Sequence, residues 1–228
     1  ASDRASVVSR CESTDLTRIC ESVRDARDRA DIVVVSVHAH EWGSTIQDPP
    51  AFLRELAHAV VDSGADIVMG HGPHVLRGIE LHNGRPIFYS LGNFIFEYEF
   101  VERMPLDTYE VLGVPPTVSP NEALGALRFR ASPEYWQSAL PLVRFDHGGV
   151  GDITLVPISL GFDQAAERRG RPVLAHGEEA SAILERLRAL SAEFETTVEI
   201  ASDGCAATVT GAASVGDSLI RADRTLTN

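Results

Sequence analysis

The feature that most constrains the fold is the run Ile-Val-Val-Val at residues 32–35, which consists only of β-branched side chains. Such a run is typical of a strand that is buried on both faces of a parallel sheet. Residues 15–29 before it and residues 50–63 after it carry apolar side chains at helical spacing, and a second apolar strand follows at residues 67–69. This order contains a βαβ unit, so we predict an α/β protein in which helices flank a layered sheet.

The later segments extend this prediction. Asn83-Gly84 lies between two apolar stretches and is typical of a hairpin turn, which predicts a β-hairpin over residues 75–91. Apolar spacing then predicts a strand at residues 153–159, a helix at 177–194 and a hairpin at 196–210.

One long segment lacks a regular pattern. Five prolines interrupt residues 97–135, so we expect an irregular insertion with weak packing there. The Ala-, Ser- and Thr-rich residues 211–228 are expected to form a flexible tail. We therefore expect one domain over residues 1–210.

Charge and cysteine content exclude several classes of protein. The chain has 228 residues and a net charge of −13, which disfavours binding to nucleic acid. No apolar run reaches the roughly 18 residues that cross a bilayer, so we expect no membrane span. Cys11, Cys20 and Cys205 have no Cys-x-x-Cys spacing, which favours reduced thiols over a disulfide framework. This favours a cytoplasmic location, with association with the cell envelope as the alternative.

Four of the eight histidines come directly after the two predicted parallel strands. His38 and His40 follow the first strand, and His71 and His74 follow the second. Because the carboxyl ends of parallel strands meet at one edge of a sheet, we expect these four rings to converge. A single histidine at a strand end is more often only a hydrogen-bonded polar group, but four in two adjacent loops favour a site for a divalent metal ion such as Zn, Mn or Fe.

Other polar residues carry weaker signals. Asn93, just beyond the predicted hairpin, either positions a substrate oxygen or water, or caps a turn. His58 falls on the helix face opposite the apolar stripe, so we expect it to be solvated, and His82, His147 and His176 are expected to be exposed or structural. The absence of a Gly-x-Ser-x-Gly elbow, a P-loop and a Gly-x-Gly-x-x-Gly fingerprint argues against acyl hydrolases, P-loop NTPases and dinucleotide enzymes.

Three segments together carry a specific pattern: VVVSVHAHE at residues 33–41, GADIVMGHGPHVL at 64–76 and PIFYSLGNF at 86–94. In this order and spacing they resemble the CapA family of bacterial capsule synthesis proteins, which is linked to poly-γ-glutamate capsule. A looser similarity runs from about residue 15 to 200. The resemblance implies a calcineurin-like metallophosphoesterase fold, of which this chain carries the C-terminal half with the N-terminal half missing.

The resemblance also assigns roles to individual residues. His38, His71 and His74 match metal ligands of the family. The family commonly has His-Trp-Gly where this chain has His38-Ala39-His40, so His40 is a weaker candidate. It commonly has a histidine where this chain has Gly72. The remaining ligands and the catalytic histidine belong to the N-terminal half of the family's pattern, so the resemblance implies about half of an active site.

Two functions are compatible with these residues. The first is a metal-dependent hydrolase of a phosphoester or related bond, which acts on a small molecule or a polymer in poly-γ-glutamate or capsule synthesis. The alternative is a non-catalytic binding or assembly component of capsule or envelope synthesis. In both cases the expected partner is a separate N-terminal half or another capsule-synthesis protein.

Overall fold

The structure, a computed structural model, describes residues 9–125, 132–146 and 149–211. Within them the first sheet has four strands in the order β1-β2-β4-β3. These strands are β1 (Val34–His38), β2 (Ile67–His71), β3 (Ile79–His82) and β4 (Arg85–Phe88). β1, β2 and β4 are parallel, whereas β3 pairs with β4 in the antiparallel sense. The predicted βαβ unit and the hairpin around Asn83-Gly84 are therefore confirmed.

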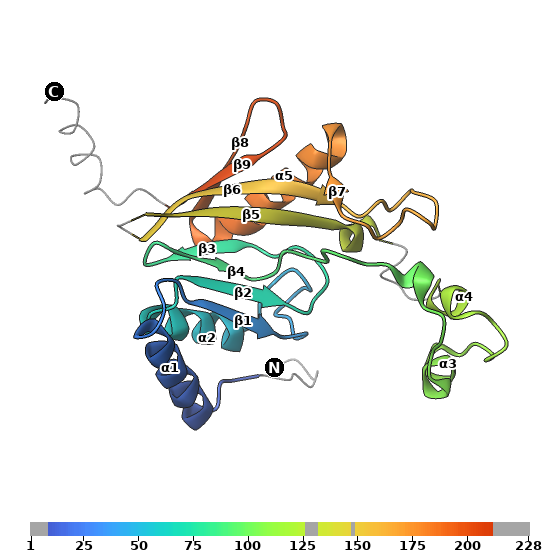
Figure 1. Cartoon of the computed structure of the whole chain (residues 1–228), viewed down its shortest axis with the longest axis horizontal. Helices are drawn as coiled ribbons and strands as arrows, with labels where there is room; N and C mark the ends of the chain where they lie inside the picture. Colours follow the sequence, from blue (N-terminus) through green and yellow to red (C-terminus); the bar gives the residue numbers. More distant parts are fainter. Residues whose placement is uncertain (1–8, 126–131, 147–148, 212–228) are drawn as a thin grey trace, which may run out of the picture.

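The second sheet is antiparallel and lies beside the first (Figure 1). Its strands follow the order β5-β6-β9-β8, and β7 pairs with β6. They are β5 (Gln137–Asp146), β6 (Gly149–Ser159), β7 (Val173–Leu174), β8 (Thr196–Ile200) and β9 (Ala207–Gly211). An isolated bridge between Gly92 and Ser138 connects the chain after β4 to β5. The predicted strand at 153–159 and the last hairpin are present, whereas β5 was not predicted.

Three longer helices cover the sheets. They are α1 (Ser13–Arg27), α2 (Ala51–Asp62) and α5 (Gly177–Ser191), and α5 continues into the 3₁₀ turn η4 (Ala192–Phe194). α1 and α2 pack against each other beside the first sheet, whereas α5 packs on β6, β8 and β3 (Figure 1). The α/β class is thereby confirmed. Within the described residues, no helix is both long and apolar enough to cross a lipid bilayer.

Successive side chains of β2 point into two different layers of the core. Ile67 belongs to the cluster that contains the apolar face of α5, and Met69 packs against it. Val68, between them, faces the cluster formed with α1 and α2. Because successive side chains of a strand point to opposite faces, β2 is covered on both faces. This central position holds the carboxyl end of β2 rigidly, where His71 lies.

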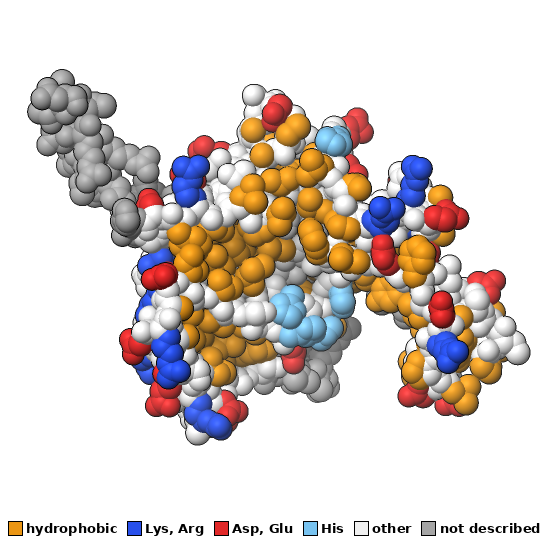
Figure 2. All heavy atoms as spheres, viewed as in Figure 1, with side chains coloured by type: hydrophobic (Ala, Val, Ile, Leu, Met, Phe, Trp, Pro, Cys, Tyr) orange, Lys and Arg blue, Asp and Glu red, His pale blue; other side chains and the backbone are white. Residues whose placement is uncertain are grey.

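The strand β1 corrects an expectation. Residues 32–35 were expected to be buried on both faces, but β1 is an edge strand among the described residues and is covered on one face only. Val33 is buried against α1 and α2, whereas the side chain of Val34 is 50% exposed. Figure 2 shows apolar side chains spread over this open face. A β-branched run reports strand propensity, and tertiary contacts decide whether one or both faces are covered.

The insertion at 97–135 is more regular than expected. Its described part contains short helices, which are η1 (Tyr98–Phe100), α3 (Leu106–Leu112), α4 (Pro120–Gly125) and η3 (Pro133–Trp136). α3 and α4 project away from the sheets (Figure 1), whereas η3 runs into β5 and its Trp136 is fully buried. Pro105 precedes α3, while Pro120 and Pro133 open α4 and η3. These prolines start helices rather than interrupt them, because the first turn of a helix needs no backbone N–H.

The termini and cysteines complete the comparison. The expected flexible tail lies outside the described residues except for Gly211, which ends β9. His147 also lies outside them. Cys11, Cys20 and Cys205 form no disulfide, as expected.

Candidate metal centre

The parallel pairing of β1 with β2 brings two of the predicted histidines side by side. His38 and His71 are register partners at the last position of their strands. Their rings meet edge to face, with centroids 4.7 Å apart. The backbone N–H of Ala39 donates to the carbonyl of His71 at 2.9 Å, which continues the ladder past both residues. The placement of these two rings is therefore fixed by backbone pairing.

His40 connects this pair to the fourth histidine. Its Nε2 lies 2.9 Å from Nε2 of His38, and its ring centroid lies 5.7 Å from that of His74. Figure 2 shows histidine side chains gathered at the carboxyl ends of β1 and β2. The structure thus brings all four histidines into one chain of neighbouring rings.

The loop after β2 needs two unusual backbone conformations. Gly72 has φ +120°, and a Cβ there would lie 2.6 Å from the carbonyl oxygen of Ala39. His74 has φ +64°, which side-chain-bearing residues adopt rarely. This strained loop lies tightly against the end of β1, and it turns the chain so that His74 reaches His40.

Asn93 is bound to the same loop. Its Oδ1 accepts from Nδ1 of His74 at 2.8 Å, and its Nδ2 donates to the carbonyls of Tyr135 and His74 at 2.9 and 3.3 Å. With the proton assigned to Nδ1, the lone pair of His74 is on Nε2. The structure therefore places Asn93 at the predicted site, as a group that orients His74.

The surroundings of His71 favour its neutral form. Partial desolvation lowers the pKa of His71, and the neighbouring ring of His38 lowers it further. Nε2 of His71 lies 2.9 Å from Oγ of Ser36, which shares the side of β1 with His38. Neutral imidazole is the form that binds metals, so this environment favours ligation.

Only pairs of these nitrogen atoms are close enough to share one cation as the rings now lie. Nε2 atoms 2.9 Å apart, as in His38 and His40, have a separation compatible with two ligands of one ion. Among the described residues, however, neither three of these histidines nor a carboxylate with two of them have ligand atoms that all lie within 4.8 Å of one another. Neutral nitrogen donors suit a borderline cation such as zinc, whereas a two-metal cluster needs bridging carboxylate oxygens.

Sequence reasoning missed a buried arginine that organises the loop beyond His40. Arg77 is 0% exposed, and its Nη2 and Nε donate to the carbonyls of Glu41 and Ile46 at 2.7 and 3.0 Å. Desolvation lowers the pKa of Arg77 to about 10, against the raising effect of nearby Asp48 and Glu41. The sequence did contain a signal for this role, because Arg77 is a charged residue within the otherwise apolar run 75–79.

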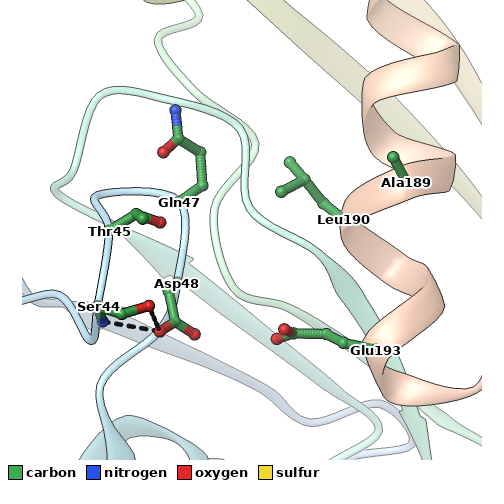
Figure 3. A pocket seen from close by; sticks show the side chains of 7 residues that line it. All are labelled: Ser44, Thr45, Gln47, Asp48, Ala189, Leu190 and Glu193. Carbon is green, nitrogen blue, oxygen red and sulfur yellow. Dashed lines mark hydrogen bonds between the residues drawn. The ribbon is translucent and has the colours of Figure 1, made fainter.

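The loop held by Arg77 borders a small cavity of about 220 Å³. Ser44, Thr45, Gln47 and Asp48 line it from the loop, and Ala189, Leu190 and Glu193 line it from the end of α5 (Figure 3). Asp48 Oδ2 accepts from the backbone N–H and the hydroxyl of Ser44, each at 2.8 Å. Arg54 crosses between Asp48 and Glu193, with Nη2 2.9 and 2.6 Å from their carboxylate oxygens. The cavity thus has a mixed polar and apolar lining, and its two carboxylates share Arg54 as their ion-pair partner.

A second group of potential ligands lies away from the strand-end histidines. Within the described residues, His58, Glu80 and His82 form the one group of three whose ligand atoms all lie within 4.8 Å of one another. His58 is more constrained than the solvated residue that was expected: its side chain is 39% exposed, but its Nε2 lies 2.7 Å from Oε1 of Glu80. Helical periodicity located its face correctly, but the β3–β4 hairpin covers that face.

Comparison with known proteins gives a consistent assignment. The model of the family described as "Bacterial capsule synthesis protein PGA_cap" matches residues 2–98, which include β1 to β4 and all four strand-end histidines. The uncharacterized protein y4sH of Sinorhizobium fredii is 38% identical over 198 residues, covering 82% of this chain and 43% of that protein.

Two further relatives carry functional names. The PGA biosynthesis protein CapA of Bacillus subtilis is 53% identical over 76 residues, covering 33% of this chain and 19% of its own. The capsule biosynthesis protein CapA of Bacillus anthracis is 43% identical over 83 residues, covering 36% and 20%. The chain thus spans less than half the length of these relatives. The segment that the family model matches, residues 2–98, carries the strand-end histidines, and through it the chain belongs to the CapA family of bacterial capsule synthesis proteins.

Proposed function

We propose that this protein is a metal-dependent hydrolase that cleaves a phosphoester or related bond during the synthesis of a poly-γ-glutamate capsule or a similar envelope polymer. The observation that carries the proposal is the convergence of four imidazoles at the carboxyl edge of a parallel sheet. Ligands of open α/β sheets bind at this edge. The names of the Bacillus relatives support the capsule context.

His38, His71 and His74 are the proposed ligands, and His40 is a further candidate. A divalent cation bound there would supply Lewis-acid polarisation of a phosphoryl or carbonyl oxygen. The register of β1 and β2 positions His38 and His71, and the strained loop positions His74. Four neutral imidazoles bring no negative charge to offset the cation, so we expect binding by these residues to be loose.

Asn93 acts as a positioning residue in this proposal. Its amide oxygen holds the Nδ1 proton of His74, which directs the Nε2 lone pair of His74 away from Asn93. Its own amide is held by the carbonyl of Tyr135, so the orientation does not depend on His74 alone. We expect Asn93→Ala to weaken metal binding about tenfold or more, as loss of such partners does at other metal sites.

A non-catalytic role in binding or assembly is the second candidate. It is favoured by the lack, among the described residues, of a carboxylate grouped with two of the strand-end histidines. In that role the same histidines would bind a metal or an anionic polymer without turnover. The two candidates differ in whether substrate is consumed.

Hydrolysis of an aryl phosphate separates them. The chelator-stripped protein is assayed with an aryl phosphomonoester and diester in the presence of manganese or zinc. We expect metal-dependent turnover that His74→Ala reduces at least a hundredfold and His176→Ala leaves unchanged, because His176 is exposed at the start of α5. Absence of turnover with retained metal binding at His71 and His74 would support the assembly role and contradict the hydrolase.

A further inference from the structure

We infer that His58, Asp62, Glu80 and His82 form a separate binding site for a divalent transition metal ion, which joins α2 to the β3–β4 hairpin. This inference is independent of the proposed hydrolase, because none of the four residues belongs to the strand-end group.

The spacing of residues along a helix and along a strand brings the four side chains together. His58 and Asp62 are four residues apart on α2, so they lie one above the other on the same face. Glu80 and His82 are two residues apart on β3, so they share one face of the strand. The site is therefore made of two pairs, each fixed by regular backbone.

The contacts across the two elements are close and specific. Nε2 of His58 lies 2.7 Å from Oε1 of Glu80, and Nε2 of His82 lies 2.9 Å from Oδ1 of Asp62. The two imidazoles stack with centroids 4.1 Å apart and planes only 4° from parallel. The histidine of each element thus faces a carboxylate of the other element. The ligand atoms of His58, Glu80 and His82 lie within 4.8 Å of one another.

The donor chemistry matches a borderline divalent cation. His58, Glu80 and His82 provide three ligand atoms. Asp62 lies beside them, with Oδ1 2.9 Å from Nε2 of His82, so the two carboxylates together offset the charge of one ion. Zinc binds nitrogen and oxygen ligands at roughly 2.0–2.2 Å with tetrahedral geometry. Because a metal–imidazole bond lies in the plane of the ring, the two parallel rings have to tilt out of their stack to share an ion. The side chains are partly exposed, which gives them this freedom and gives the ion a path from solvent.

Neighbouring groups hold the carboxylates in place. The hydroxyl of Tyr89 donates to Oε2 of Glu80 at 2.6 Å, which leaves Oε1 directed at His58. Burial raises the pKa of Tyr89 far above its ordinary value, so the hydroxyl stays a donor. Nδ2 of Asn83 donates to Oδ1 of Asp62 at 2.8 Å. Such outer hydrogen bonds are a regular feature of metal sites.

The site lies at the opposite end of the sheet from the strand-end histidines. His82 pairs with Arg85 at the start of β4, whereas His71 lies at the end of the parallel strand β2. An ion at His82 therefore has no contact with substrate at the other edge. Its effect is to stabilise the packing of α2 on the hairpin, since it binds the folded protein only.

Metal-induced stabilisation and cobalt spectroscopy test the inference. Full-length protein is stripped with a chelator and titrated with Zn²⁺, while its Tm is followed. We expect a rise of about 5 °C at saturating zinc. We also expect Co²⁺ to give the visible absorption of a four-coordinate site at one equivalent.

Variants assign the signal to one of the two groups of histidines. The double variant His58→Gln, His82→Gln should lose the cobalt spectrum at one equivalent and the rise in Tm, apart from what loose binding at the strand-end histidines contributes. The triple variant His38→Ala, His71→Ala, His74→Ala should keep them while it loses any hydrolytic activity. His176→Gln serves as the matched control for an exposed histidine and should behave like the wild type.

A milder variant covers the case in which the double variant does not fold. Glu80→Gln keeps the volume and the hydrogen-bonding capacity of Glu80 but removes its charge, so it should weaken zinc binding at least tenfold in a folded protein. An equal rise in Tm in the wild type, the double variant and Glu80→Gln would overturn the inference. Absence of any zinc effect on the wild type would overturn it as well, and would show that the four side chains are only hydrogen-bonded pairs.

Discussion

His38 and His71 are direct neighbours across the parallel strands β1 and β2, and their rings meet edge to face at 4.7 Å. The pairing is made by the backbone ladder, which continues to the hydrogen bond between Ala39 and His71. Two candidate ligands are therefore placed by rigid strands, and only His40 and His74 depend on loops. Sites built on regular elements hold their geometry better than sites on loops.

Gly72→Ala should disturb this site more than an ordinary change of a glycine with positive φ. Its Cβ would lie 2.6 Å from the carbonyl oxygen of Ala39, and its φ of +120° is strained for any side chain. We expect a loss of at least about 3 kcal/mol in the free energy of unfolding, measured by urea denaturation.

Gly84→Ala is the matched control for this change. Gly84 also has positive φ, at +73°, but its Cβ would meet nothing within 4 Å. We expect a loss of about 1 kcal/mol for this variant. Equal losses at Gly72 and Gly84 would show that the close approach to Ala39 contributes nothing.

Arg77→Met should release the loop that follows His40. The substitution keeps an unbranched chain but leaves the carbonyls of Glu41 and Ile46 without their donor, at a cost of about 2 kcal/mol. Arg77→Lys should not restore stability, because one ammonium cannot reproduce the fork of the guanidinium. Limited proteolysis should cut the loop at residues 43–48 faster in both variants.

Arg54→Met provides the comparison for Arg77. Its side chain is 35% exposed and its ion pairs with Asp48 and Glu193 are accessible to solvent, so the loss should stay below about 1 kcal/mol. Cleavage of the loop at an unchanged rate in Arg77→Met would contradict the role assigned to Arg77.

Asp48 should make stability depend on pH. The backbone N–H of Ser44 is the main cause that lowers the pKa of Asp48, with further lowering by the Ser44 hydroxyl and by Arg54. A lowered pKa in the folded state stabilises above the unfolded value of about 4, and this stabilisation is lost as the pH falls through the folded value. Asp48→Asn should therefore cost about 1 kcal/mol at pH 7.

The difference between Asp48→Asn and the wild type should shrink as the pH is lowered below about 4 in urea titrations. Ser44→Ala should show a weaker pH dependence than the wild type, because it removes one of the hydrogen bonds to the carboxylate. A constant difference between Asp48→Asn and the wild type from pH 7 to pH 3 would rule out this account.

Proteases should cut residues 97–135 before the sheets. In the described part of this segment, α3 contacts mainly α4, and α4 contacts mainly η1, so few contacts hold them to the sheets. Mass spectrometry of early fragments should place the first cuts there, with β1 and β2 intact. First cuts within residues 34–38 or 67–71 would contradict this expectation.

Local sequence patterns were sufficient to predict most of the regular elements. The βαβ unit, the hairpin at Asn83-Gly84 and α5 each follow from signals within one segment, because apolar spacing and turn residues act over a few positions. β5 was missed because Pro141 interrupts its pattern. A proline is tolerated there because β5 lies at the end of its sheet, where one side of the strand has no ladder to complete.

The convergence of His38 and His71 was also predictable, since parallel strands have a known polarity. The pairing of His58 with Glu80 was not, because a helical pattern tells which face is polar but not which distant strand covers it. The same limit applies to Val34: its β-branched side chain indicates a strand, but it does not tell whether another element packs on that side chain. Local propensity decided which segments form helices and strands. With the known polarity of parallel strands, it also decided the end of the sheet at which the candidate ligands gather. Tertiary packing, which depends on contacts between residues far apart in the chain, decided which faces are covered and which polar groups meet.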